Sequence, residues 1–181
     1  CASSSHAIGI AMQFLRAGLA DIVIAGGTEA PLSAGTLLAW DAMRIMSRTA
    51  CRPFAAGRDG LMLAEGAGVI VLETEAHARS RGLEPTIEAA GFGFSADAGD
   101  IVAPNVDGMT RAMALALADA GLDVGDLAYI NAHGTGTRAN DRAETQALKR
   151  LFGDRPVPPT SSIKGATGHA LGAAGAFEAI A

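Results

Sequence analysis

The sequence is poor in aromatic and charged residues. Aromatic side chains make up 4% of its 181 residues and charged side chains 18%, whereas hydrophobic residues reach 49%. This combination excludes an intrinsically disordered chain. With few rings available, the core must be built from Ala, Leu, Ile, Val and Met, and the 23 glycines indicate close packing of the backbone. The length fits one domain or one large piece of a domain.

Basic charge, cysteine and long apolar runs are also scarce. The formal net charge is −5, which argues against nonspecific nucleic-acid binding because such binding depends on a basic surface. Cys1 and Cys51 are too few for a disulfide framework, so we expect a reducing, cytoplasmic setting. No apolar run approaches the roughly 18 residues that a membrane helix needs, so we expect no membrane segment.

Segments of two kinds alternate along the chain. Short continuous apolar runs predict buried strands, and apolar residues spaced three or four apart predict helices. The alternation predicts an α/β fold, with Ser3 or Ser4 capping the first helix. A boundary near residues 83–85 would divide the chain into segments 1–83 and 84–181. We expect helices over residues 3–18, 36–46, 74–82, 107–122, 140–153 and 168–181, and strands or extended segments over 21–27, 67–73, 86–96, 127–134 and 157–163.

Cys1 stands immediately before the first predicted helix. The positive end of the helix dipole would favour its thiolate and so raise its nucleophilicity at neutral pH. The alternative is a small buried cysteine that only fills the core.

His133 follows a predicted buried strand and opens the glycine-rich turn "HGTGT". The end of a strand is where α/β proteins place ligands and catalytic groups. Asp141 and Glu144 open the next predicted helix three positions apart and therefore share one face of it. These two carboxylates could serve chemistry, or they could merely satisfy the start of the helix.

Lys164 and His169 lie at a second junction between an extended segment and a helix, in a run made almost wholly of small residues. Taken singly, they could be a surface lysine and a capping histidine. Together with Cys1 and His133 they form a set of side chains that could carry out acyl chemistry. A thiolate can hold an acyl group as a thioester, and two imidazole N–H donors can stabilise an enolate oxygen. Lys164 could hold the hydrogen-bond network, with Glu144 as its counter-ion.

This set suits carbon–carbon bond formation by decarboxylative condensation. A metal site is the rival use of one cysteine and two histidines. No spacing in the sequence fits a metal signature such as CxxC or HExxH, so we expect no metal.

Four motifs, in this order, resemble those of a known family: "CASSSHAIGIA", "RPFAAGRDGLMLAEGAG", "NAHGTGTRANDRAE" and "SSIKGATGHALGAAG". Together they resemble the β-ketoacyl-acyl-carrier-protein synthases, condensing enzymes with the thiolase fold, and the resemblance runs over the whole chain. It implies a five-layered αβαβα fold truncated at both ends. Segment 1–83 would be the C-terminal part of the first half, starting at the nucleophile. Segment 84–181 would be most of the second half, without its C-terminal gate loop.

The resemblance also assigns roles to single residues. It implies that Cys1 is the acyl-accepting nucleophile and that His133 and His169 are the histidine pair of the active site. Lys164 resembles the active-site lysine of the family, and Glu144 resembles the acidic residue that pairs with it.

Contacts with the substrate carrier follow in the same way. Thr135 and Thr137 resemble the threonines that hydrogen-bond a phosphopantetheine arm, and Arg44 falls where some members contact the acidic acyl carrier protein. The implied reaction condenses malonyl-acyl-carrier-protein with an acyl chain held on Cys1, and the enzyme itself uses no metal or organic cofactor. The resemblance implies a homodimer, or a heterodimer with a chain-length partner. Cys51 does not match the second cysteine of thiolases and is expected to be a bystander.

The motifs point to more than one subfamily. "NAHGTGT" and "TGHALGAAG" are similar to the fatty-acid elongation type, whereas "NDRAET" is similar to ketosynthases of aromatic-polyketide, aryl-polyene or nodulation-factor pathways. Two other functions stay open: a non-catalytic partner subunit and a cysteine acyl-hydrolase. The chain begins on Cys and ends in a helical pattern, so we expect a fragment that is inactive when isolated because sheet edges are left unpaired.

Overall fold

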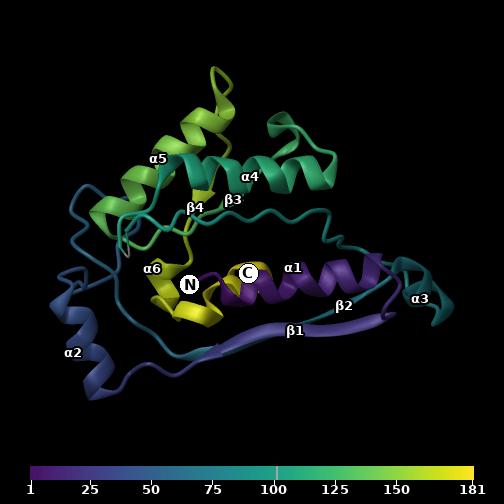
Figure 1. Cartoon of the computed structure of the whole chain (residues 1–181), viewed down its shortest axis with the longest axis horizontal. Helices are drawn as coiled ribbons and strands as arrows, with labels where there is room; N and C mark the ends of the chain where they lie inside the picture. The colour runs from purple at the N-terminus through teal and green to yellow at the C-terminus, as the bar shows by residue number, and fades with distance from the viewer. Residues whose placement is uncertain (101) are drawn as a thin grey trace. The chain divides into compact units, whose positions relative to one another are not determined.

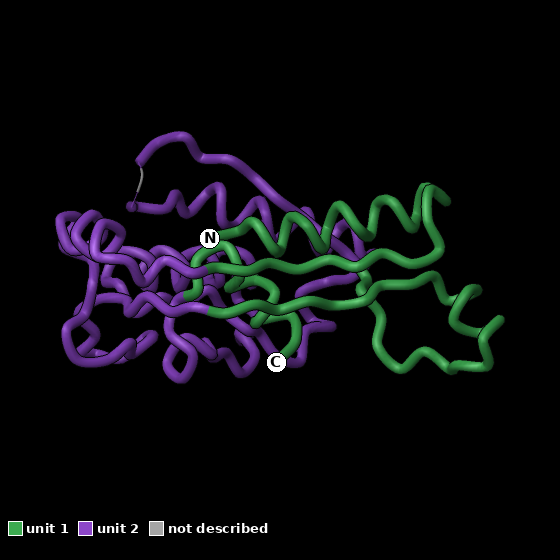
Figure 2. The backbone as a smooth tube through the Cα atoms, turned by 90° about the horizontal axis from the view of Figure 1, so that it is seen from below, with its two compact units in different colours: residues 1–29, 66–90, 170–181 green, residues 30–65, 91–169 purple. Residues whose placement is uncertain are grey.

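The computed structural model describes residues 1–100 and 102–181, which cluster into two compact units (Figure 2). Unit 1 comprises Cys1–Glu29, Gly66–Ala90 and Ala170–Ala181, and unit 2 comprises Ala30–Glu65 and Gly91–His169. Each unit therefore joins stretches that are far apart in sequence. The predicted boundary between segments 1–83 and 84–181 divides the sequence, not these spatial units, and stays a prediction.

Unit 1 is built on a two-stranded antiparallel sheet. Its elements are α1 (Ser3–Arg16), β1 (Ile22–Glu29), β2 (Gly66–Glu73), α3 (Glu75–Ser80), the 3-10 helix η2 (Leu171–Ala173) and α7 (Ala174–Ile180), which Figure 1 labels except for η2 and α7. The register pairs Ile24 with Val71 and Gly27 with Gly68. The strands β1 and β2 and the helices α1 and α3 lie where the sequence predicts them.

Small residues let the helices of unit 1 approach one face of this sheet. A Cβ atom on Gly27 would lie 2.8 Å from Ser4 Cβ and 2.9 Å from the carbonyl oxygen of Gly172. A Cβ atom on Gly68 would lie 3.0 Å from Ala176 Cβ. Glycine at position 27 is therefore required by the close approach of the neighbouring backbone, and glycine at position 68 leaves room for the side chains of α7.

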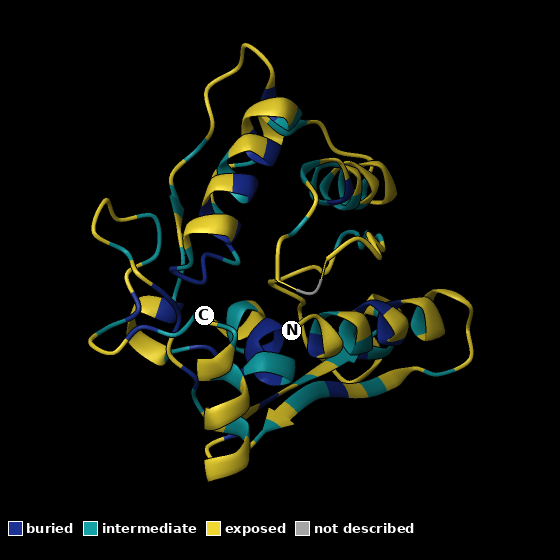
Figure 3. Ribbon diagram, turned by 60° about the vertical axis from the view of Figure 1, so that its left-hand side comes forward, coloured by how far each residue is buried: buried dark blue, intermediate teal, exposed yellow. Residues whose placement is uncertain are grey.

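The opposite face of the sheet is exposed. Ile24 is 70% exposed and Val71 63% exposed, and the two form a direct cross-strand pair. The prediction that both strands are fully buried is therefore wrong for this chain, because helices pack on one face alone. In Figure 3, which colours each residue by its burial, buried positions form short stretches among half-buried and exposed ones.

Unit 2 contains more helix than sheet. Its elements are α2 (Ala34–Ala42), α4 (Val106–Ala120), the 3-10 helix η1 (Val124–Asp126), β3 (Ile130–Asn131), α5 (Arg138–Phe152), β4 (Thr160–Ser161) and α6 (Lys164–Thr167). The short strands β3 and β4 are parallel. Helices α4 and α5 contact each other and share an ion pair between Asp107 and Arg150.

The sequence predicts the ends of α4 and α5 well. The side chain of Asn105 caps α4 by accepting from the N–H of Asp107 at 2.7 Å, and Gly121 ends the helix at a φ of 69°. The hydroxyl of Thr137 caps α5 by accepting from the N–H of Asn140 at 3.3 Å. These are the side chains that helix termini ordinarily select.

The strand predicted over residues 86–96 is not among the strands of the described residues. Within unit 2, Gly91 and Gly93 instead lie against α4, where a Cβ atom on Gly93 would be 2.3 Å from the carbonyl oxygen of Ala112. The N–H of Phe92 donates to Asp119 Oδ2 at 2.9 Å, so a side chain of the helix replaces a neighbouring strand.

Two further predictions about helices are wrong. The segment 168–181 is divided among an irregular stretch, η2 and α7, because the main chain of His169 bonds to Met62 and Ala64 and Leu171 has a φ of 41°. The N-cap of α1 is Ala2 and makes no side-chain cap. Ser4 is buried instead, and its hydroxyl accepts from the N–H of Ala176 at 2.9 Å. No helix within residues 1–100 and 102–181 is long and apolar enough to cross a membrane.

Candidate active site

His133 is placed by the end of β3 and by the turn that leads to α5. Ala132 continues the strand, since its N–H donates to the carbonyl of Ser161 at 2.8 Å. The chain then turns sharply at Gly134, where φ is 38° and an added Cβ atom would lie 2.5 Å from Ser162 Cβ. Glycine is therefore needed directly after His133, and the imidazole is presented at the carboxyl end of the strand, as the sequence predicts.

Two charged side chains hold the main chain of this turn. Glu144 accepts from the N–H of His133 at 2.7 Å and from the N–H of Gly134 at 2.8 Å. Lys164 Nζ donates to the carbonyl oxygen of His133 at 2.7 Å. Glu144 and Lys164 were expected as a pair, and the structure connects them through the peptide groups of His133.

Lys164 also fixes the ring of His133. Its Nζ lies 3.2 Å from His133 Nδ1, and Lys164 is 1% exposed. An ammonium group can only donate, so Nδ1 must accept and the proton of a neutral ring must sit on Nε2. His133 Nε2 is thereby left as a hydrogen-bond donor.

His169 is held by its main chain rather than by a helix. Its N–H donates to the carbonyl oxygen of Met62 at 2.7 Å, and its own carbonyl accepts from the N–H of Ala64 at 3.0 Å. These bonds form a parallel bridge between Leu63 and His169. The loop around residue 63 thus positions the second histidine, a contact between distant segments that local sequence patterns do not reveal.

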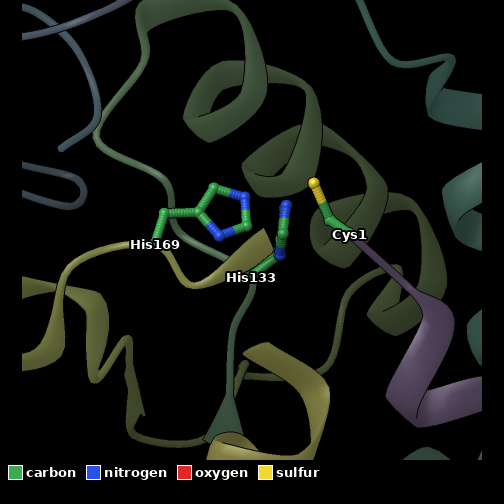
Figure 4. A group of neighbouring side chains, drawn as sticks. All are labelled: Cys1, His133 and His169. Atoms are coloured by element: carbon green, nitrogen blue, oxygen red, sulfur yellow. The ribbon is translucent and has the colours of Figure 1, made fainter. Parts of the chain in front are cut away.

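The two imidazoles of unit 2 meet edge to face. Their ring centroids are 5.2 Å apart and their planes make an angle of 83°, and Figure 4 shows the ring of His169 face-on and that of His133 edge-on. Burial, followed by the charge of Lys164, lowers the pKa of His169 to about 3. The same two causes, in the same order, lower the pKa of His133 well below its ordinary value. Both rings are therefore neutral at physiological pH and can act as donors without carrying charge.

The two threonines of the turn have structural partners. Thr135 Oγ1 and Thr137 Oγ1 share a hydrogen bond of 2.9 Å, and Thr137 also caps α5. Thr135 is buried, and its carbonyl oxygen accepts from Cys51 Sγ at 3.2 Å. Burial raises the pKa of Cys51, which keeps it a neutral thiol at physiological pH. Cys51 is thus a packing residue beneath the turn, and a phosphopantetheine role for the threonines stays a prediction.

Asp141 does more than the sequence suggested. It is 1% exposed, and Thr137 already caps the helix that it opens. Asp141 Oδ1 accepts from the N–H of Gly136 at 3.2 Å, and Oδ2 accepts from the N–H of Phe54 at 2.7 Å. The idea that Asp141 merely satisfies the helix start is wrong, because the carboxylate joins two loops. The sequence signal for this role is the position of Asp141 about one helical turn before Glu144, on the same face of α5.

Cys1 belongs to unit 1 and Arg44 to unit 2. Cys1 precedes α1 in unit 1, in agreement with the prediction of a thiol ahead of a helix N-terminus. Arg44 is exposed in unit 2, directly after α2, at a φ of 55°. A left-handed conformation is uncommon for a residue with a long side chain.

Comparison with known proteins identifies the chain's relatives. Residues 1–78 match the family model for the beta-ketoacyl synthase N-terminal domain, and residues 86–181 match the model for the C-terminal domain. The chain belongs to the β-ketoacyl synthase family. Nodulation protein E of Rhizobium sp. (strain N33) is 52% identical over 182 residues, which cover 100% of this chain and 45% of that protein.

Other relatives of this family are similar over the same extent. The 3-oxoacyl-(acyl-carrier-protein) synthase 2 of Staphylococcus aureus is 43% identical over 99% of this chain and 47% of its own length. The chain thus spans about half the length of the curated relatives that it matches.

Solved structures have the same fold. The ishigamide ketosynthase/chain length factor superposes with a TM-score of 0.95 at 38% identity, over 99% of this chain and 44% of that chain. A type II polyketide synthase acyl-carrier protein in complex with its ketosynthase bound to the hexaketide gives a TM-score of 0.94 at 38% identity, over 99% and 47% of the two chains. The predictions of the family and of a thiolase-like α/β fold are confirmed.

Proposed function

We propose that the protein containing this chain catalyses decarboxylative Claisen condensation of malonyl-acyl-carrier-protein with an acyl chain held on Cys1. The observation that carries the proposal is the pair of neutral, edge-to-face imidazoles of His133 and His169, with Nδ1 of His133 occupied by Lys164. Membership of the β-ketoacyl synthase family supports it.

The first half of the reaction is acyl transfer. The Cys1 thiolate attacks the carbonyl carbon of an acyl thioester, and the thiolate of the phosphopantetheine arm leaves. The position of Cys1 ahead of α1 supports this role, because the helix N-terminus favours an anionic sulfur. Thr135 and Thr137 would bind the arm.

The second half is condensation. The malonyl thioester loses carbon dioxide, and negative charge develops on the oxygen of the resulting enolate. Neutral N–H donors aimed at that oxygen stabilise it, and His133 Nε2 is such a donor because Lys164 occupies Nδ1. The enolate carbon then attacks the thioester on Cys1, the Cys1 thiolate leaves, and a β-ketoacyl chain remains on the carrier.

Substrates and partners follow from the same proposal. Acyl and malonyl groups would arrive on the phosphopantetheine of an acyl carrier protein, with Arg44 in contact with the carrier and no cofactor in the enzyme itself. A solved relative is a ketosynthase in complex with its acyl-carrier protein, and another is a ketosynthase/chain length factor. These support a carrier partner and a homodimer or heterodimer. Both cysteines are thiols, which supports a cytoplasmic setting.

Two variants of the full-length protein test the proposal. Cys1→Ala should abolish formation of β-ketoacyl product. His169→Ala should also abolish condensation but leave acyl transfer to Cys1 measurable with a labelled acyl thioester. Unchanged product with Cys1→Ala would support a non-catalytic partner subunit instead. Hydrolysis of acyl thioesters that survives His169→Ala, without condensation in the wild type, would support an acyl-hydrolase.

A further inference from the structure

Arg58 is a charged residue of unit 2 with no part in the proposed reaction. Its Nε lies 3.4 Å from Asp141 Oδ2, and its side chain is 21% exposed while that of Asp141 is fully buried. One guanidinium nitrogen of Arg58 donates to the carbonyl oxygen of Ala55 at 2.9 Å. Arg58 therefore links its own loop to the buried carboxylate.

A buried carboxylate needs such a partner. Removing an anion from water is costly unless a cation and hydrogen-bond donors compensate it. Asp141 receives the N–H groups of Gly136 and Phe54 together with the side-chain amide of Asn140 at 3.3 Å. Arg58 supplies the opposite charge beside the carboxylate that accepts these three hydrogen bonds.

Phe54 shows what the carboxylate holds in place. It has a positive φ of 61°, a conformation that costs a non-glycine residue free energy unless its surroundings fix it. The hydrogen bond from its N–H to Asp141 is such a constraint. Its ring packs on Gly134, where an added Cβ atom would lie 2.8 Å from Phe54 Cε2.

Phe54 and Gly136 therefore support the turn of His133 from two sides, and both depend on Asp141. Gly136 has a φ of 78° and lies so close to the loop of residues 51–60 that a Cβ atom would be 2.9 Å from the carbonyl oxygen of Gly60. A shift of either contact would move Gly134, the residue next to His133. Misplacement of a catalytic group by about 1 Å can lower a rate about a hundredfold.

We propose that Arg58 is a positioning residue for the condensation step: by compensating Asp141, it fixes Phe54 and Gly136 and so keeps the His133 imidazole in its reactive orientation. This inference rests on the proposed function. It extends the active-site assembly to the motif "RPFAAGRDG".

The test compares three single variants in the full-length protein. Arg58→Met removes the charge and keeps the length of the side chain, Arg58→Lys keeps the charge, and Arg52→Met changes an exposed arginine of the same loop. We expect Arg58→Met to lower kcat by about 10- to 100-fold with KM for the malonyl carrier changed less than about twofold. Arg58→Lys should restore much of kcat, and Arg52→Met should behave as wild type.

A double variant separates positioning from general destabilisation. In Asp141→Asn the buried charge is gone, so adding Arg58→Met should cost less than it does alone. Wild-type kcat in Arg58→Met, an equal loss in Arg52→Met, or a full additional loss in the double variant would overturn the inference. If Arg58→Met does not fold, Arg58→Gln, which also removes the charge, takes its place in each of these comparisons.

A spectroscopic measurement keeps the two proposals apart. Nitrogen-15 NMR of the His133 ring should report protonation at Nε2 in the wild type and a mixture of tautomers in Arg58→Met, whether or not the protein condenses substrates. An unchanged tautomer in Arg58→Met would contradict the role of Arg58. Absence of condensation in the wild type would contradict the proposed function alone.

Discussion

Unit 1 and unit 2 are stabilised by different kinds of contact. In unit 1 the buried positions are mostly small, among them Ala11, Ala25 and Ala176, and glycines allow helices to lie directly on the sheet. In unit 2 the largest fully buried side chains are polar, namely Lys164, His169 and Asp141. The difference shows where precision comes from in each unit: from close packing of backbones in the first, and from compensated charge and hydrogen bonds in the second.

The packing of unit 1 should be the most sensitive to added volume. We expect Gly27→Val to lower the free energy of unfolding by about 3 kcal/mol, because its side chain would overlap Ser4 and the carbonyl of Gly172. Chemical denaturation of the full-length protein measures the loss. Gly35→Ala is the matched control, since no atom lies within 4 Å of the added Cβ atom and alanine favours the helix. Equal stability of the two variants would show that unit 1 is not packed in this way.

The polar network of unit 2 should be most sensitive at Lys164. Lys164→Met removes the donor to His133 Nδ1 and to the His133 carbonyl, so we expect condensation to fall by about a hundredfold. Lys149→Met, at an exposed position of α5, serves as the control in the same steady-state assay. If both variants keep wild-type rates, Lys164 does not govern the ring of His133.

The histidines of unit 2 should make stability depend on pH. The pKa of His169 is about 3 in the folded protein, below the ordinary value of about 6.5. Between these values the unfolded chain binds a proton that the folded chain does not, so stability falls as pH decreases below about 6.5.

The slope from each such histidine is at most about 1.4 kcal/mol per pH unit. Unfolding free energies of wild type and His169→Gln, compared between about pH 7 and pH 5, should show a shallower slope in the variant. The same slope in both proteins would mean that His169 titrates alike in the folded and unfolded states.

The sequence predicts much of the fold because its signals are local. Apolar runs mark β1 and β2, and helical spacing predicts the ends of α1, α3, α4 and α5 to within two residues, so these elements follow from local patterns. Predictions fail where contacts between distant segments decide the local conformation of the chain. Residues 91–96 lie along α4 with glycines against its backbone, and the C-terminal helix is interrupted where His169 pairs with Leu63.

The residues of the candidate site likewise include some that the sequence predicts and some that only the structure reveals. His133, His169 and Lys164 are predictable from chemistry and spacing, and the structure brings all three together in unit 2. The roles of Phe54 and Arg58 could not be predicted, because they arise where a loop more than 80 residues upstream meets Asp141.

Mass spectrometry of the acyl-enzyme tests the central claim most directly. The full-length protein is incubated with an acyl thioester of its carrier protein, digested, and examined for the added acyl mass. We predict that the acyl group is found on the peptide that carries Cys1, is absent from the peptide that carries Cys51, and is released as a β-ketoacyl product when malonyl carrier is added. An acyl group on Cys51, or on neither cysteine, would contradict the assignment of Cys1 as the nucleophile.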